Sequence, residues 1–170
     1  LGVTNGVVNL RTGTLEKPSP SLLVTKRANV NFDSSASGET FEAFLRSVLP
    51  DEEEREFLIR WLGYVLSGLV TEQYFLFIHG KGANGKSVLA EFIAWLLGDY
   101  ALRIDTQMLM RQNRSSQAAS PDIVSLAGRR LVYCSETTDG QRLDDARVKE
   151  MTGGDTLQGR ELYARSPITF

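Results

Sequence analysis

A run of eight residues, Gly80 to Ser87, has the spacing of a phosphate-binding loop (P-loop). It fits the pattern G-x-x-x-x-G-K-[ST] at every position. Glycines let the backbone turn tightly, so that several N–H groups converge on phosphate oxygens. Lys86 would neutralise the β- and γ-phosphates, and the Ser87 hydroxyl would hold magnesium. The pattern predicts binding of ATP with Mg²⁺ by Gly80, Lys81, Gly82, Ala83, Asn84, Gly85, Lys86, Ser87 and Val88.

Hydrolysis also needs an acid at the end of a neighbouring strand, to order magnesium or polarise the attacking water. Leu131-Val-Tyr-Cys134 reads as a buried strand, and Glu136 follows it. We therefore predict Lys86 and Glu136 as catalytic residues, with Ser87 and Glu136 as candidates for the metal. The usual pattern has two adjacent acids, but Ser135 precedes Glu136 here. Magnesium would then be held mainly by Ser87, phosphate and water.

The elements around the loop predict an α/β fold with a parallel-sheet P-loop core. Residues 74–78 are continuously apolar and aromatic, which is typical of a strand buried on both faces. Residues 88–97 have a helical pattern, and Gly98 suits its end. A strand before the loop and a helix after it are the context that a phosphate-binding loop requires.

The region before this core, residues 1–70, predicts a small hairpin followed by helices, and residues 71–170 would form the ATPase core. Residues 1–17 read as a hairpin with a turn at 11–13. Thr40 is a candidate N-cap for a helix over 40–49, and Asp51 for the next helix. That second helix carries an apolar stripe of Phe57, Leu58, Trp61, Leu62, Val65, Leu66 and Leu69.

Composition excludes several classes of protein. The net charge of -2 provides no global basic field of the kind that nucleic-acid binders show, although a local basic loop can act inside a neutral protein. The single cysteine, Cys134, sits in an apolar run and reads as a structural thiol in a reducing, cytoplasmic setting. No run of apolar residues approaches a membrane span.

The chain resembles superfamily 3 helicases, specifically the C-terminal helicase part of phage and plasmid primases and of the poxvirus primase-helicase. Three segments carry the resemblance: Gly80 to Ser87, Gly128 to Thr137, and Lys149-Glu-Met-Thr-Gly-Gly-Asp155 with Gly159-Arg160 and Leu162-Tyr163 after it. The front of the chain, at 5–10 and 57–69, is similar to the domain that precedes the ATPase core in that family.

The resemblance implies an AAA+-type ATP-driven motor that works as a homo-oligomeric ring, usually a hexamer, on single-stranded DNA. It also implies that the segment after the second acid motif forms a hairpin into the central channel. Residues 155–170 suggest two strands around 161–166, with Arg160, Tyr163 and Arg165 near the tip and Lys149 upstream on a helix. Arginines can bind phosphates and tyrosine can stack on bases. Ordinary surface charge is the alternative for each of these four residues.

The sequence departs from the family's pattern because it carries neither the polar-ended sensor strand nor the interface arginine. We therefore expect a fragment of a longer protein, with little or no ATPase or unwinding activity by itself. Two other functions stay open. One is a small-molecule P-loop kinase, with 103–114 as its arginine-bearing lid. The other is a non-catalytic module for oligomerisation or DNA loading.

Overall fold

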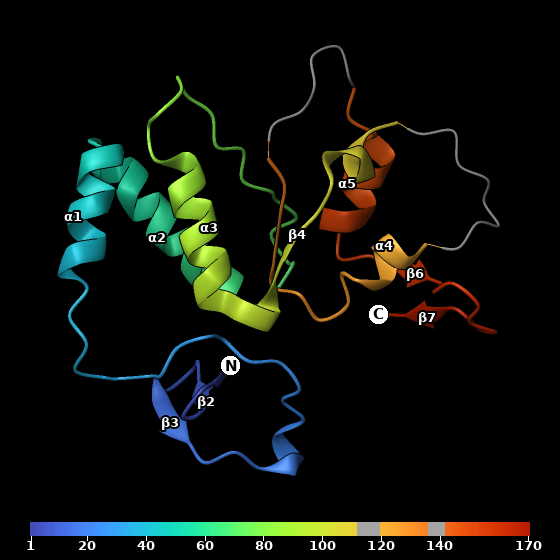
Figure 1. The fold of residues 1–170 in the computed structure, drawn as a ribbon, viewed down its shortest axis with the longest axis horizontal. Helices are drawn as coiled ribbons and strands as arrows, with labels where there is room; N and C mark the ends of the chain where they lie inside the picture. Colours follow the sequence, from blue (N-terminus) through green and yellow to red (C-terminus); the bar gives the residue numbers. More distant parts are fainter. Residues whose placement is uncertain (112–119, 136–141) are drawn as a thin grey trace. The chain divides into compact units, whose positions relative to one another are not determined.

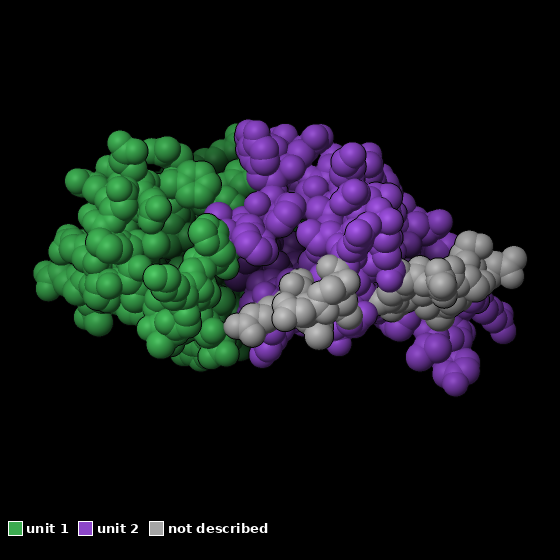
Figure 2. Space-filling model, turned by 90° about the horizontal axis from the view of Figure 1, so that it is seen from above, with its two compact units in different colours: residues 1–68, 78–101 green, residues 69–77, 102–170 purple. Residues whose placement is uncertain are grey.

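The computed structural model describes residues 1–111, 120–135 and 142–170. It divides into two compact units, which Figure 2 colours separately. Unit 1 comprises Leu1–Gly68 and Ile78–Ala101, and unit 2 comprises Leu69–Phe77 and Leu102–Phe170. The predicted P-loop therefore lies in unit 1, with the N-terminal residues. The architecture is mixed α/β with small sheets.

Within these described ranges, no helix combines the length and the apolar character that crossing a membrane requires.

Three short strands at the N-terminus form an antiparallel sheet in the order β1-β2-β3 (Figure 1). They are β1 (Gly2–Val3), β2 (Gly6–Asn9) and β3 (Thr14–Glu16). Val8 pairs with Leu15, which confirms the predicted hairpin, and β1 adds a third strand to it. The valines of β1 and β2 are buried. A short 3-10 helix, η1 (Pro20–Leu22), follows.

Two helices, α1 and α2, come next. Helix α1 (Glu39–Val48) begins after Gly38, so Thr40 lies inside it and the prediction of Thr40 as N-cap is wrong. Helix α2 (Glu52–Ser67) is capped by Asp51, whose carboxylate accepts a hydrogen bond from the Glu54 N–H at 3.1 Å. It ends at Gly68 in the left-handed conformation. Glutamates in the first turn of α2 add favourable charge at the helix N-terminus.

Of the apolar stripe predicted on α2, Leu58 and Val65 are buried, while Phe57 is 54% exposed. The helical period of the stripe is confirmed, but only part of it faces the core of unit 1.

Helix α3 (Lys86–Leu97) confirms the helix predicted over 88–97 and is anchored at its C-terminal end. The Asn29 side chain donates to the Trp95 carbonyl at 2.9 Å, and the Asn29 N–H donates to the Leu96 carbonyl at 3.0 Å. These bonds satisfy carbonyls that a helix end leaves without partners. The following 3-10 turn, η2 (Gly98–Tyr100), brings the Tyr100 hydroxyl between the Gly2 N–H and the Lys26 carbonyl.

The prediction of a buried strand over residues 74–78 is wrong. Residues 74–80 have no strand assignment, and Tyr74, Phe75, Phe77 and Ile78 are all exposed. A strand buried on both faces needs a hydrogen-bonded neighbour and a layer on each side. The sheets of the described residues do not include this segment. The parallel-sheet core therefore stays a prediction.

Unit 2 is built around the buried side chains of Met108, Ile123 and Leu126. Strands β4 (Ala101–Arg103) and β5 (Leu131–Tyr133) form a two-stranded sheet, and β5 confirms the strand predicted before Glu136. Strands β6 (Gln158–Gly159) and β7 (Ile168–Thr169) pair antiparallel. The helices are η3 (Thr106–Leu109), α4 (Pro121–Val124) and α5 (Asp145–Thr152). Figure 1 labels α4, α5 and both hairpin strands.

We predict that replacing Asp51 with alanine lowers the free energy of unfolding by about 1 kcal/mol, because the Glu54 N–H loses its acceptor. The Asp51→Asn variant keeps an acceptor oxygen and serves as the matched control. Urea denaturation followed by circular dichroism measures both. Equal stability of the alanine variant and the wild type would contradict the capping role.

Candidate functional site

The backbone of the predicted P-loop, residues 80–87, turns back on itself before it enters α3. Ala83 and Gly85 have positive φ angles of 57° and 82°, and Gly80 has a φ of 153°. A side chain at Gly85 would be strained by this backbone, and its Cβ would lie 2.6 Å from Val48 Cγ1 of α1. Glycine is therefore required where the loop passes over the end of α1 and becomes a helix.

The Lys86 side chain folds back over the loop from the first residue of α3. Its Nζ donates to the Asn84 Oδ1 at 2.6 Å, to the Gly80 carbonyl at 3.1 Å and to the Lys81 carbonyl at 3.5 Å. An ammonium group has three donors, so the loop can occupy all of them. The positive charge is thus fixed at the loop, close to the start of α3.

The N-terminus of α3 opens onto the same loop. Within the described residues, no side chain caps the first turn, because the N-cap position is taken by Gly85. The first backbone N–H groups of a helix have no intrahelical partners, and they favour a bound anion. Residues 81–84 and Ser87 are accessible to solvent, so a ligand can reach the loop. A lysine ammonium, helix N–H groups and open access together suit a phosphate group.

Only one of the two predicted metal ligands lies among the described residues. Ser87 lies in the first turn of α3. Glu136 lies outside the described residues, although the strand that precedes it, β5, is present. No group of three or more metal-ligating side chains occurs in the part of the chain that the structure describes. The site predicted from Ser87 and Glu136 therefore stays a prediction.

The predicted DNA-binding residues all lie in unit 2. Arg160, Tyr163 and Arg165 belong to the loop that joins β6 to β7, and all three are exposed. Tyr163 is 100% exposed and has a φ of 65°. The predicted hairpin and its tip are therefore confirmed as structure. Lys149 is exposed on a separate element, α5.

The base of this hairpin is fixed against α4, which Figure 1 shows beside β6. The Ser120 N–H donates to the Arg160 carbonyl at 2.9 Å, and the Arg160 N–H donates to the Ser120 hydroxyl at 3.2 Å. Gly159 is buried so close to α4 that an added Cβ would lie 2.9 Å from Val124 Cγ2. The strands thus hold a polar, exposed tip on a packed base.

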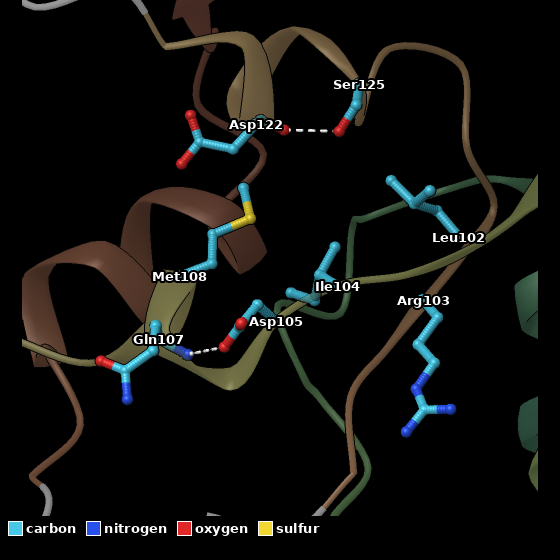
Figure 3. A pocket seen from close by; sticks show the side chains of 8 residues that line it. All are labelled: Leu102, Arg103, Ile104, Asp105, Gln107, Met108, Asp122 and Ser125. Atoms are coloured by element: carbon cyan, nitrogen blue, oxygen red, sulfur yellow. Dashed lines mark hydrogen bonds between the residues drawn. The ribbon is translucent and has the colours of Figure 1, made fainter.

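Sequence reasoning missed a shallow hollow in unit 2 of about 340 Å³ (Figure 3). It is lined by Leu102, Arg103, Ile104, Asp105, Gln107, Met108, Asp122 and Ser125. Its polar groups serve local structure. The Asp105 carboxylate accepts from the Gln107 N–H at 2.8 Å and caps η3, and the Ser125 hydroxyl donates to the Asp122 carbonyl at 2.6 Å.

The hollow contributes little chemistry of its own. The Arg103 side chain extends away from Met108 and Asp122 in Figure 3 and donates to the Ser135 hydroxyl at 3.0 Å.

Two effects raise the pKa of the Cys134 thiol: partial burial, which is the larger, and the nearby negative charge of Asp105. A raised pKa keeps the thiol protonated at neutral pH, which agrees with the structural role predicted for Cys134.

Comparison with known proteins adds two findings. Residues 1–50 match the model of a family described as D5 N terminal like. The whole chain is 33% identical, over an alignment of 174 residues, to a protein of Acanthamoeba polyphaga mimivirus named "Putative helicase". It is also 33% identical over 129 residues, 75% of the chain, to a protein of Frog virus 3 with the same description. A protein of African swine fever virus named "Putative primase" is 28% identical over 119 residues, 69% of the chain.

The family match and these relatives support a relation of this chain to primase-helicases. The chain spans 18%, 13% and 12% of the length of these three relatives, respectively. Residues 1–50, which match the family model, include β1 to β3, η1 and α1.

We predict that Gly85→Ala destabilises unit 1 by about 2 kcal/mol, because alanine is strained in the left-handed region and its Cβ meets Val48. Gly82→Ala is the matched control in the same loop, since nothing lies within 4 Å of an added Cβ there. Its effect should stay within about 0.5 kcal/mol. Thermal unfolding measures both, and equal effects of the two substitutions would contradict the role assigned to Gly85.

Proposed function

We propose that this chain is the nucleotide-binding part of an ATP-dependent primase-helicase of DNA replication. The observation that carries the proposal is the Lys86 ammonium, which three loop oxygens hold at the N-terminus of α3. The relatives named helicase and primase support the same direction.

In this proposal the loop binds the phosphates of ATP, with Mg²⁺ as the counter-ion. Backbone N–H groups at the start of α3 donate to phosphate oxygens, and Lys86 neutralises the β- and γ-phosphates. Ser87 holds Mg²⁺, and Glu136 orients or activates the attacking water. The parent protein uses hydrolysis to drive movement along single-stranded DNA, as a homo-oligomeric ring.

The proposal assigns DNA contact to the exposed groups of unit 2. Two arginines and a fully exposed tyrosine share the β6–β7 loop, which allows both phosphate binding and base stacking in one place. The packed base of the hairpin holds this tip in position. Lys149 on α5 adds a further positive charge.

We predict that Lys86→Ala weakens the binding of Mg-ATP by about 10- to 100-fold, the usual range for removing charge-assisted hydrogen bonds. Lys81→Ala is the matched control, because it removes the same charge from the same loop while its backbone carbonyl remains. Titration calorimetry measures both dissociation constants. If Lys81→Ala weakens binding as much as Lys86→Ala does, general charge and not the P-loop geometry binds the nucleotide.

We predict that the double variant Arg160→Gln, Arg165→Gln weakens binding to a fluorescent oligothymidine and reduces its salt dependence. The slope of log affinity against log salt should fall by about 0.7 for each DNA phosphate that the variant no longer binds. Tyr163→Ala should weaken binding by about 1–3 kcal/mol without changing that slope. Arg11→Gln, an exposed arginine beyond β2, is the control. An unchanged slope in the double variant would remove the hairpin loop from the DNA interface.

A further inference from the structure

The side chain of Asn84 has a place in the P-loop that the pattern G-x-x-x-x-G-K-[ST] does not assign, since the pattern accepts any residue there. Its Oδ1 accepts a hydrogen bond from Lys86 Nζ at 2.6 Å. This hydrogen bond is the shortest of the three that the ammonium donates to the loop. The other two acceptors are backbone carbonyls, so among these three acceptors Asn84 provides the one that a side-chain substitution removes.

The amide of Asn84 also explains a requirement at the start of the loop. A Cβ built on Gly80 would lie 2.4 Å from Asn84 Nδ2 and 3.8 Å from Lys86 Nζ. The space that a side chain at Gly80 would take is therefore occupied by the Asn84 amide. The two ends of the loop are in contact through this side chain, with the lysine ammonium beside it.

We propose that Asn84 is a positioning residue for nucleotide binding: its amide oxygen holds the Lys86 ammonium over the loop before the phosphates arrive. The inference rests on the proposed nucleotide-binding function. A free lysine side chain samples many rotamers, and ordering it costs free energy each time a ligand binds. In this structure the order is already present, so phosphate meets a fixed positive charge.

Charge explains why an amide suits this position. An amide oxygen accepts from the ammonium without carrying a negative charge. A carboxylate in its place would pair with Lys86 and would repel the phosphates that Lys86 must bind. Asn84 can therefore hold the lysine without neutralising it.

The test is a double-mutant cycle on this chain, with titration of Mg-ATP and Mg-AMP. We expect Asn84→Ala to weaken ATP binding about tenfold, the factor that corresponds to ordering one lysine side chain. In the Lys86→Ala background the same change should alter ATP affinity by less than about twofold, because its target is gone. AMP, which lacks the β- and γ-phosphates, should bind equally to the wild type and to Asn84→Ala.

Asn84→Asp is a second variant that checks the charge argument, and it should bind ATP more weakly than Asn84→Ala. Circular dichroism and the thermal midpoint confirm that each variant folds. If Lys86→Ala binds ATP as tightly as the wild type, the proposed function itself fails. If Lys86→Ala weakens binding, three results overturn the role of Asn84 alone. These are wild-type or tighter affinity of Asn84→Ala, an equal decrease in affinity in both lysine backgrounds, and wild-type affinity of Asn84→Asp.

Discussion

The candidate site depends on one backbone constraint, the left-handed conformation at Gly85 where the predicted P-loop becomes α3. The chain enters the helix directly against Val48 at the end of α1, and only glycine leaves room for that approach. The other end of α3 is held by hydrogen bonds from Asn29 and by the glycine turn at Gly98. With both ends fixed, the first turn of α3 and the Lys86 side chain keep a defined position beside the loop.

The chemistry of the loop follows from this position. A helix N-terminus presents backbone N–H groups and a partial positive charge. Lys86 adds a full charge that is already bound to loop oxygens, one of them from Asn84. Each of these features favours an anion at the same point, because Asn84, Lys86 and the first turn of α3 are neighbours in the sequence. A triphosphate carries enough charge and enough acceptor oxygens to use all of them.

Features set by local spacing could be predicted from the sequence, while features set by distant contacts could not. The helix that begins at Lys86, the Asp51 cap and the C-terminal hairpin are encoded within a few residues each. The contact of Gly85 with Val48 joins segments far apart in the sequence, and no local pattern indicates it.

The error at residues 74–78 has a related cause. Their composition suits a buried strand, but a strand also needs a neighbour, and composition does not say whether one is present. Thr40 is a good capping residue by type, yet the helix begins before it. The role predicted for Glu136 is a different matter: it stays a prediction, because Glu136 lies outside the described residues.

The central claim is that this loop recognises the β- and γ-phosphates of a nucleotide. Titration calorimetry of the wild-type chain with ATP, ADP and AMP, each with Mg²⁺, tests it most directly. If the loop acts as described, affinity rises from AMP to ATP, and ATP binds at least about tenfold more tightly than AMP. This is expected when Lys86 exchanges a hydrogen bond to the loop for charge-assisted hydrogen bonds with the added phosphates. Equal affinity for the three nucleotides, or no binding of ATP, would contradict the account.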